Sequence, residues 1–221
     1  MRRVEPRFFK LYLVTDSALC GDRTLADVVR AAVQGGVTCV QLREKSLSTR
    51  EFLERACLLK EVLSEGTDPV PLIINDRLDI ALACKADGVH VGQSDMPPEV
   101  IRNHMPDALI GLSVESVADA RRVEERALPV DYLGVSPVFA TQTKVDTAAP
   151  LGLSGLAAIR ALTTLPLVAI GGIGASNAAA ALSAGADGLA VVSAILAAPD
   201  PREASRALMA VIEGHQSMRQ P

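Results

Sequence analysis

Aromatic residues are scarce in this sequence, and so are uninterrupted hydrophobic segments. Aromatics make up 3% of the 221 residues, tryptophan is absent, and 49% of the chain is hydrophobic. The core must therefore be built from Ala, Val, Leu and Ile, which suits layered α/β packing better than a β-sandwich. The charge-free stretch between Arg160 and Asp187 contains Pro166, Gly171 and Gly172, so we interpret it as strand, turn and helix and exclude a membrane span.

Paired cysteines, basic clusters and an apolar leader are also missing. The four cysteines (Cys20, Cys39, Cys57 and Cys84) form no CxxC pair, and no apolar segment of a signal peptide follows the opening MRRVEPRFFK. We therefore expect reduced thiols in a cytoplasmic protein. A net charge of −4 without a basic run argues against nucleic acid as a partner. Any anion binding must depend on a few local cations.

Eight short aliphatic segments alternate with helical patterns along the chain. They are Leu11–Thr15, Cys39–Arg43, Leu72–Asn75, Gly88–Val91, Leu109–Ser113, Tyr132–Ser136, Leu167–Ile170 and Gly188–Val192. Between them Val28, Val29 and Ala32 share one face of an expected helix, and Ser48 with Glu51 has the pattern of a capping box.

Eight strand–helix units in a chain near the usual length of about 250 residues predict a (β/α)₈ TIM barrel. We expect one such domain over residues 1–221. The segments ADGVHVG and ADGLAVV support a repeated unit, since Asp87 and Asp187 stand 100 residues apart. An open doubly wound sheet is the less favoured alternative, because it usually has fewer strands.

The chemistry of such barrels lies at the carboxyl ends of the strands, so polar residues there carry functional weight. The second strand runs into VQLREKS. Alternation along a strand directs Gln41, Arg43 and Lys45 toward the barrel mouth, while Leu42 and Glu44 face the other way. Two cations in register suit phosphate oxygens, with a surface salt bridge as the alternative.

Carboxylates follow the third and fourth strands. Asp76 comes directly after Asn75, and Asp95 follows Gly92 in the next loop. Two carboxylates at neighbouring strand ends predict a Mg²⁺ site that is completed by water and substrate phosphate, although either aspartate alone would also suit a turn or an N-cap. The three histidines lack the spacing of zinc ligands, and we interpret His90 as a core or pocket-wall residue.

Hydroxyl groups and glycines follow the remaining strands. Ser113 ends the fifth strand, and the polar loop TQTKVD begins at Thr141 after the sixth. The segments VAIGGIGASN and AVVSAIL follow the last two strands, where barrels of this kind commonly bind phosphate. Two anion sites across one mouth suit two phosphorylated substrates, one of them a magnesium-bound diphosphate.

Taken in order, these motifs resemble the thiamine-phosphate synthase family. The matching segments are QLREK at 41–45, IINDR at 73–77, ADGVHVGQSD at 86–95, GLS at 111–113, TQTK at 141–144, AIGGI at 169–173 and GADG with VVSAI within 185–195. The resemblance covers nearly the whole chain. It implies a transferase that joins 4-amino-2-methyl-5-hydroxymethylpyrimidine diphosphate to 4-methyl-5-(2-phosphooxyethyl)thiazole, which gives thiamine phosphate and diphosphate.

The resemblance also implies the site residues and the mechanism. The pyrimidine diphosphate would be bound by Gln41, Leu42, Arg43, Glu44, Lys45, Asn75, Ser113 and Lys144, of which Arg43, Lys45, Ser113 and Lys144 would be catalytic. The thiazole phosphate would be bound by Thr141, Gln142, Thr143, Gly172, Val192 and Ser193, and Mg²⁺ by Asp76 and Asp95. Cations and metal would stabilise the departing diphosphate while the thiazole nitrogen attacks. The partners would be small phosphorylated molecules, with neither nucleic acid nor membrane, and a homo-oligomer fits the same pattern.

Two alternatives remain open from the sequence. A thiazole tautomerase-like isomerase of the same barrel family would need the thiazole-phosphate residues but not the cluster of Arg43, Lys45, Asp76, Asp95 and Lys144. A non-catalytic sensor of phosphorylated ligands should lose the metal ligands first. Because the whole cluster is present, the sequence favours the transferase over both.

Overall fold

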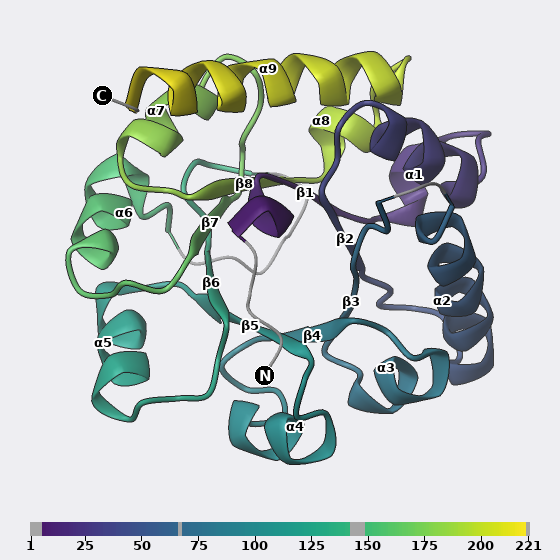
Figure 1. Cartoon of the computed structure of the whole chain (residues 1–221), viewed down its shortest axis with the longest axis horizontal. Helices are drawn as coiled ribbons and strands as arrows, with labels where there is room; N and C mark the ends of the chain where they lie inside the picture. The colour runs from purple at the N-terminus through teal and green to yellow at the C-terminus, as the bar shows by residue number, and fades with distance from the viewer. Residues whose placement is uncertain (1–5, 66–67, 142–148, 220–221) are drawn as a thin grey trace.

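Eight parallel strands form a closed barrel in chain order (Figure 1). The computed structural model describes residues 6–65, 68–141 and 149–219. The strands are β1 Leu11–Val14, β2 Cys39–Leu42, β3 Leu72–Asn75, β4 Gly88–Val91, β5 Leu109–Val114, β6 Tyr132–Val135, β7 Leu167–Ile170 and β8 Gly188–Val191. Pairing of β1 with both β2 and β8 closes the ring. The predicted (β/α)₈ barrel is confirmed.

All eight strands end within one residue of the predicted position, and the second strand shows why some differ. The backbone N–H of Arg43 donates to the side-chain hydroxyl of Thr15 at 3.1 Å and not to a backbone carbonyl. The ladder therefore stops at Leu42, one residue earlier than expected. Strand ends at a functional rim are set by such local side-chain bonds, which alternation of apolar residues does not reveal.

Helices surround the barrel (Figure 1). They are α1 Leu25–Gln34, α2 Thr49–Leu63, α3 Leu78–Cys84, α4 Pro98–His104, α5 Val117–Glu125, α6 Gly152–Arg160, α7 Ala178–Ser183, α8 Ser193–Leu196 and α9 Pro201–Arg219, with 3₁₀ helices η1 Pro6–Phe9 and η2 Ser17–Cys20. The predicted capping box is confirmed, because Ser48 and Glu51 each accept a hydrogen bond from the other's backbone N–H. No helix within the described ranges is long and apolar enough to cross a membrane.

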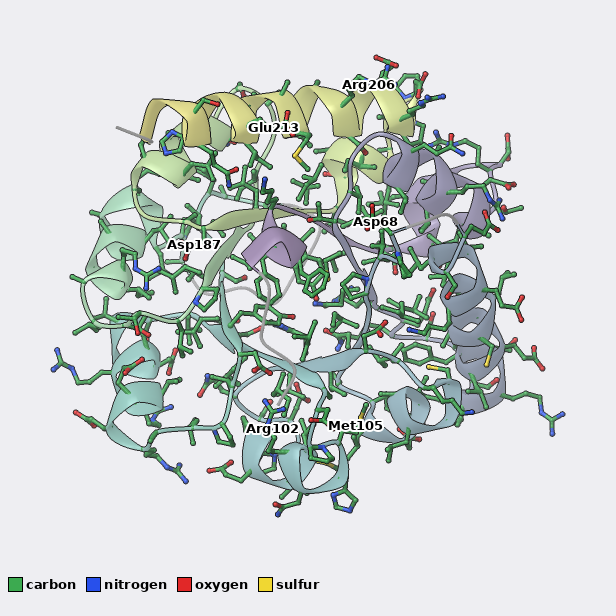
Figure 2. All side chains as sticks on the ribbon, viewed as in Figure 1. Asp68, Arg102, Met105, Asp187, Arg206 and Glu213 are labelled. Atoms are coloured by element: carbon green, nitrogen blue, oxygen red, sulfur yellow. The ribbon has the colours of Figure 1, made fainter. Side chains whose placement is uncertain are left out.

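The described residues form two apolar cores, and side chains fill the ring of strands (Figure 2). The larger core lies between the strands and the helices and is mainly aliphatic. The smaller one fills the barrel and contains Phe9, Tyr12 and Tyr132, with Phe9 and Tyr132 rings 4.5 Å apart. Both tyrosines of this aromatic-poor chain are thus used inside the barrel, where large rings fill space that Val and Ala cannot.

The amino-terminal face of the barrel carries a repeated hydrogen bond. The residue before each even-numbered strand accepts the backbone N–H of a residue at the start of the preceding odd-numbered strand. The pairs are Leu11 to Thr38 at 3.0 Å, Leu72 to Asp87 at 2.9 Å, Ile110 to Asp131 at 2.7 Å and Leu167 to Asp187 at 2.8 Å. This repeat explains why the ADG segments recur: their aspartates accept equivalent bonds.

Three of these acceptors also bind a cation from the helix that precedes the odd-numbered strand. The ion pairs are Lys60 with Asp87, Arg102 with Asp131 and Arg160 with Asp187. Each carboxylate therefore joins a helix to two neighbouring strands, and we call these three groups the aspartate clasps. Because they lie opposite the face that carries barrel chemistry, their role is stability.

We predict that Asp131→Ala destabilises the fold by about 2 kcal/mol, because it leaves the buried Ile110 N–H without its acceptor and removes the ion-pair partner of Arg102. The measurement is urea unfolding followed by circular dichroism. Asp187→Ala is the matched control. Its carboxylate is 48% exposed against 18% for Asp131, so water can replace more of what is lost and the effect should be smaller. An equal or larger loss for Asp187→Ala would contradict this account of the clasps.

Candidate active site

Two adjoining cavities of about 480 and 470 Å³ open at the carboxyl ends of the strands. The first lies beside the loops after β7 and β8, and we call it the glycine cavity, after Gly171, Gly172 and Gly174. The second lies beside the ends of β2 to β5, and we call it the aspartate cavity, after Asp76 and Asp95. The cavities share a wall made by Val14, Arg43, Ser136, Ile170 and Ala190.

The aspartate cavity contains the predicted residues of the second strand on the predicted side. Gln41, Arg43 and Lys45 line it, together with Asn75, Asp76, Asp95 and Ser113. Leu42 and Glu44 do not line either cavity. Leu42 is completely buried in the larger core, and Glu44 accepts hydrogen bonds from Ser17 and Arg55, both at 2.6 Å. Alternation along β2 therefore separates the side chains that face the cavity from those that pack or pair with the rest of the fold.

Asp76 has an unusual backbone conformation at the end of β3. Its φ of 64° lies in the left-handed region, which is uncommon outside glycine and is best tolerated by Asp and Asn. A hydrogen bond from its N–H to the carbonyl of His90 fixes it at 2.8 Å, and its carboxylate accepts from Lys45 Nζ at 2.8 Å. Such outliers concentrate at functional sites, where the surrounding structure holds them in place.

Asp95 lies beside Asp76 at the same rim. Its Oδ2 accepts from the backbone N–H of Gly92 at 2.7 Å, and a Cβ at Gly92 would lie 3.0 Å from this oxygen. Partial desolvation raises the pKa of Asp95, and the neighbouring Asp76 carboxylate raises it further, while Gly92 N–H and Lys45 act in the opposite direction. Two acidic side chains this close repel each other when both are ionised, so the pair suits a shared cation.

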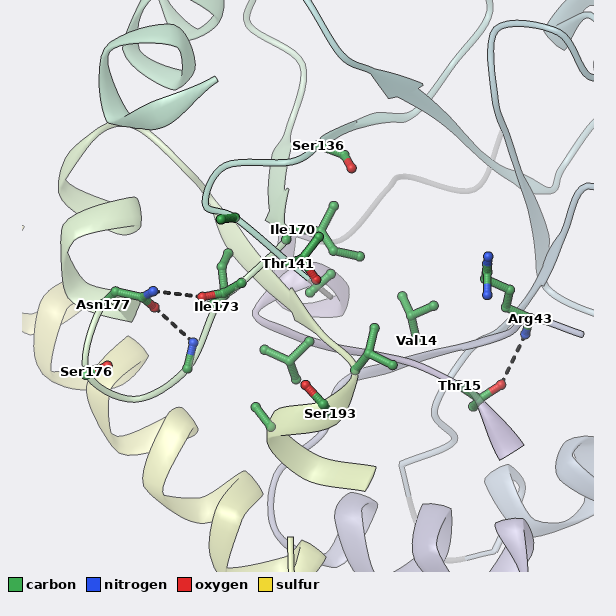
Figure 3. A pocket seen from close by; sticks show the side chains of 18 residues that line it. Val14, Thr15, Arg43, Ser136, Thr141, Ile170, Ile173, Ser176, Asn177 and Ser193 are labelled. Carbon is green, nitrogen blue, oxygen red and sulfur yellow. Dashed lines mark hydrogen bonds between the residues drawn. The ribbon is translucent and has the colours of Figure 1, made fainter. Parts of the chain in front are cut away.

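Arg43 is the cation that belongs to both cavities. It is half-buried in the shared wall, and no carboxylate in residues 6–65, 68–141 and 149–219 forms an ion pair with it. Figure 3 shows it across the glycine cavity from Asn177. A guanidinium at the junction of two cavities, without a counter-ion among the described residues, is suited to an anionic ligand.

The glycine cavity is formed by tightly packed loops. Gly172 has a φ of 62°, and a Cβ there would lie 2.4 Å from the carbonyl oxygen of Ala140, so only glycine allows this approach. Asn177 accepts from Gly174 N at 2.9 Å and donates to the Gly172 carbonyl at 2.8 Å (Figure 3). These bonds fix a glycine loop whose backbone can approach a ligand, next to Ser193 at the start of α8.

The predicted thiazole-phosphate residues gather here as far as the structure describes them. Thr141, Gly172, Val192 and Ser193 all line the glycine cavity. Gln142, Thr143 and Lys144 lie outside the described residues. Their predicted roles therefore stay sequence-based predictions.

Residues that the sequence did not single out for the site also line these cavities. Among them are Tyr12, Tyr132, Ser136 and Asn177. The interpretation of His90 as a core or pocket-wall residue is confirmed, since its side chain is buried and lines the aspartate cavity. The tyrosines lie within apolar segments, and the usable signal was their rarity: the chain has only two, and both occur in predicted strands.

The geometry defines a class of protein. A closed (β/α)₈ barrel carries a carboxylate pair, a lysine and an arginine in one cavity and a glycine-loop cavity after β7 and β8 next to it. This is the arrangement of a barrel enzyme acting on phosphorylated small molecules. Residues 11–195 match the family model described as thiamine monophosphate synthase. The chain belongs to this family, and it is a transferase whose condensation reaction gives thiamine phosphate.

Known thiamine-phosphate synthases are similar to this protein along almost the whole chain. It is 60% identical over 205 residues to a thiamine-phosphate synthase of Albidiferax ferrireducens, covering 92% of each chain. It is 50% identical to one of Chloroflexus aurantiacus, covering 92% of this chain and 93% of the relative. A solved thiamine phosphate pyrophosphorylase from Pyrococcus furiosus superposes with a TM-score of 0.86 at 38% identity, covering 95% of this chain and 98% of that one. The isomerase and sensor alternatives are thereby set aside.

Proposed function

We propose that the two cavities divide the two substrates of this condensation. The aspartate cavity binds the pyrimidine diphosphate, and the glycine cavity binds the thiazole phosphate. The observation that carries this division is the shared wall: Arg43 and Ser136 line both cavities, so ligands in the two cavities meet there. A nucleophile held in one cavity then faces an electrophile held in the other, which is how positioning accelerates a two-substrate reaction.

The carboxylate pair fits a magnesium ion. Asp76 and Asp95 would supply hard oxygen ligands, and their mutual repulsion is relieved by a divalent cation. Within the described residues no group of three or more His, Cys, Asp and Glu side chains could hold a metal, so the remaining ligands would be water and diphosphate oxygens. When bound, Mg²⁺ supplies positive charge that favours departure of the diphosphate.

Arg43 and Lys45 add the protein's own positive charge to that of Mg²⁺ at the diphosphate. Arg43 presents a planar fork to diphosphate oxygens, and Lys45, already oriented by Asp76, adds a point charge. As the methylene C–O bond of the pyrimidine substrate breaks, the electron pair leaves with the diphosphate and the aminopyrimidine carries the positive charge. The thiazole nitrogen then forms the new C–N bond. Apolar wall residues Val14, Ile170 and Ala190 limit water at the meeting point, which strengthens these electrostatic interactions.

A matched pair of serine variants tests the division. Ser113 lines only the aspartate cavity and Ser193 only the glycine cavity. We predict that Ser113→Ala lowers kcat/KM for the pyrimidine diphosphate about tenfold, whereas Ser193→Ala raises KM for the thiazole phosphate by a similar factor, each through one lost hydrogen bond to a charged or polar ligand. Steady-state kinetics with each substrate varied in turn gives kcat/KM and KM for both substrates in each variant. Equal effects of both variants on both substrates would refute the division.

A further inference from the structure

A chain of hydrogen bonds crosses the barrel beneath the aspartate cavity. Gln41 Nε2 donates to the Tyr12 hydroxyl at 3.0 Å, and the Tyr12 and Tyr132 hydroxyls are 2.9 Å apart. Tyr132 is 3.0 Å from His90 Nδ1, and His90 Nε2 is 2.9 Å from Ser113 Oγ. The chain therefore links β2, β1, β6, β4 and β5, and both of its ends are predicted ligand-binding residues.

Glycines on the neighbouring strands leave room for these hydrogen-bonded side chains. Tyr12 and Tyr132 are at most 1% exposed, and His90 is 8% exposed. A Cβ at Gly111 would lie 2.2 Å from the Tyr132 ring and 2.3 Å from His90 Nδ1, and one at Gly134 would lie 2.9 Å from His90 Cε1. Real Cβ atoms do not approach so closely, so glycine on both β5 and β6 is what lets the two rings occupy these positions.

The bonds have a definite direction. Burial raises the pKa of both phenols well above their ordinary value, so both keep their protons. The Tyr12 hydroxyl accepts a hydrogen bond from Gln41. Its only oxygen partner among the described residues is the Tyr132 hydroxyl, so Tyr12 donates its proton there. Tyr132 must then donate to His90 Nδ1. In a neutral imidazole this places the ring proton on Nε2, which donates it to Ser113.

The reverse direction satisfies fewer groups. Ser113 would donate to His90, His90 to Tyr132 and Tyr132 to Tyr12. The Tyr12 proton would then have no oxygen or nitrogen acceptor among the residues that the structure describes, since Gln41 already donates to this hydroxyl. A buried hydroxyl left without a strong acceptor costs free energy, so the first direction is the stable one.

We propose that Tyr132 and His90 are positioning residues that hold Ser113 as a hydrogen-bond donor to the substrate in the aspartate cavity. Since His90 Nε2–H occupies a lone pair of Ser113 Oγ, the serine proton is directed away from the histidine. The serine backbone is fixed as well, because Gln93 Nε2 donates to its carbonyl at 2.7 Å. Ser113 therefore offers its proton to an acceptor atom, a ring nitrogen or an anionic oxygen. This inference rests on the proposed placement of the pyrimidine diphosphate.

Two variants separate this role from simple core packing. Tyr132→Phe removes the donor to His90 Nδ1. Tyr12→Phe is the matched control: it removes an equally buried hydroxyl but keeps the bond between Tyr132 and His90. Heteronuclear NMR of histidine-labelled protein distinguishes a protonated ring nitrogen from a bare one, and the His90 signals are assigned by their loss in His90→Gln. Thermal unfolding of both tyrosine variants measures how far each affects the fold.

The expected result has two parts. His90 carries its proton on Nε2 in the wild type and in Tyr12→Phe, whereas Tyr132→Phe gives a mixture of tautomers. In Tyr132→Phe, kcat/KM for the pyrimidine diphosphate falls about tenfold, while KM for the thiazole phosphate changes less than twofold.

A proton on Nδ1 in the wild type would overturn the inference, as would a Tyr132→Phe enzyme with unchanged kcat/KM for the pyrimidine diphosphate. Failure of the underlying proposal looks different. If Ser113→Ala uses both substrates normally, the placement of the pyrimidine diphosphate is wrong, whatever the tautomer of His90.

Discussion

Asp76→Asn should reduce turnover by about 10²- to 10³-fold while the protein stays folded, an effect comparable to losing one preorganised electrostatic group at a site of developing charge. Asparagine tolerates the left-handed φ of this position, so the backbone at the end of β3 is preserved. What is lost is the negative charge of one of the two proposed carboxylate ligands, which is also the charge that pairs with Lys45. The measurement is the rate as a function of Mg²⁺ concentration, with both substrates saturating.

Asp79→Asn is the matched control for this experiment. It removes a carboxylate three residues away that is 58% exposed, pairs with Arg77 and lines neither cavity. We expect it to leave the Mg²⁺ dependence unchanged. Near-wild-type activity of Asp76→Asn at limiting Mg²⁺ would show that Asp76 is not a metal ligand.

Arg43→Ala should lower kcat/KM for the pyrimidine diphosphate by about 100-fold, since hydrogen bonds to charged groups are the stronger ones and the fork makes two of them. Arg43→Lys should recover part of the loss, because it restores the charge but not the planar pair of donors. The measurement is steady-state kinetics with the pyrimidine diphosphate varied. Partial rescue by lysine distinguishes a ligand-binding role from a packing role.

Arg206→Ala on the outer face of α9 serves as the control for general loss of a cation (Figure 2). This arginine is exposed and pairs with Glu203 on its own helix. It should behave like the wild type. If Arg43→Ala also matched the wild type, the shared wall would not be the place where the diphosphate binds, and the proposed division of substrates would lose its main support.

The strands and the charged residues of the aspartate cavity could be predicted because their sequence signals are local. Alternation along β2 is enough to direct Gln41, Arg43 and Lys45 to one side, and a polar residue directly after an aliphatic segment marks a strand end. Asp76 and Asp95 were predictable as neighbours for the same reason, since consecutive strands of a barrel lie side by side.

The remaining contacts depend on closure of the barrel, which no local pattern contains. Tyr12 and Tyr132 are 120 residues apart in the sequence, yet their hydroxyls meet inside the ring. Alternation turns Glu44 away from the cavity, but nothing in the sequence indicates that its partner will be Arg55 on α2. Asn177 likewise fixes the glycine loop through two backbone bonds that depend on the exact fold of that loop. Such residues are found only once distant strands are placed together.

The aspartate clasps also bear on how the chain assembles. Their ion pairs join residues only 27 to 29 positions apart, so each can form as soon as one helix and the two strands that follow it are in place. The first pair of strands, β1 and β2, has the neutral Thr38 at the position where the other three pairs have an aspartate bound to a cation. Pairing of Leu11 with Leu189, by contrast, joins the two ends of the barrel. The entropy of bringing distant segments together is therefore concentrated in this single seam, while the rest of the ring grows by short-range steps.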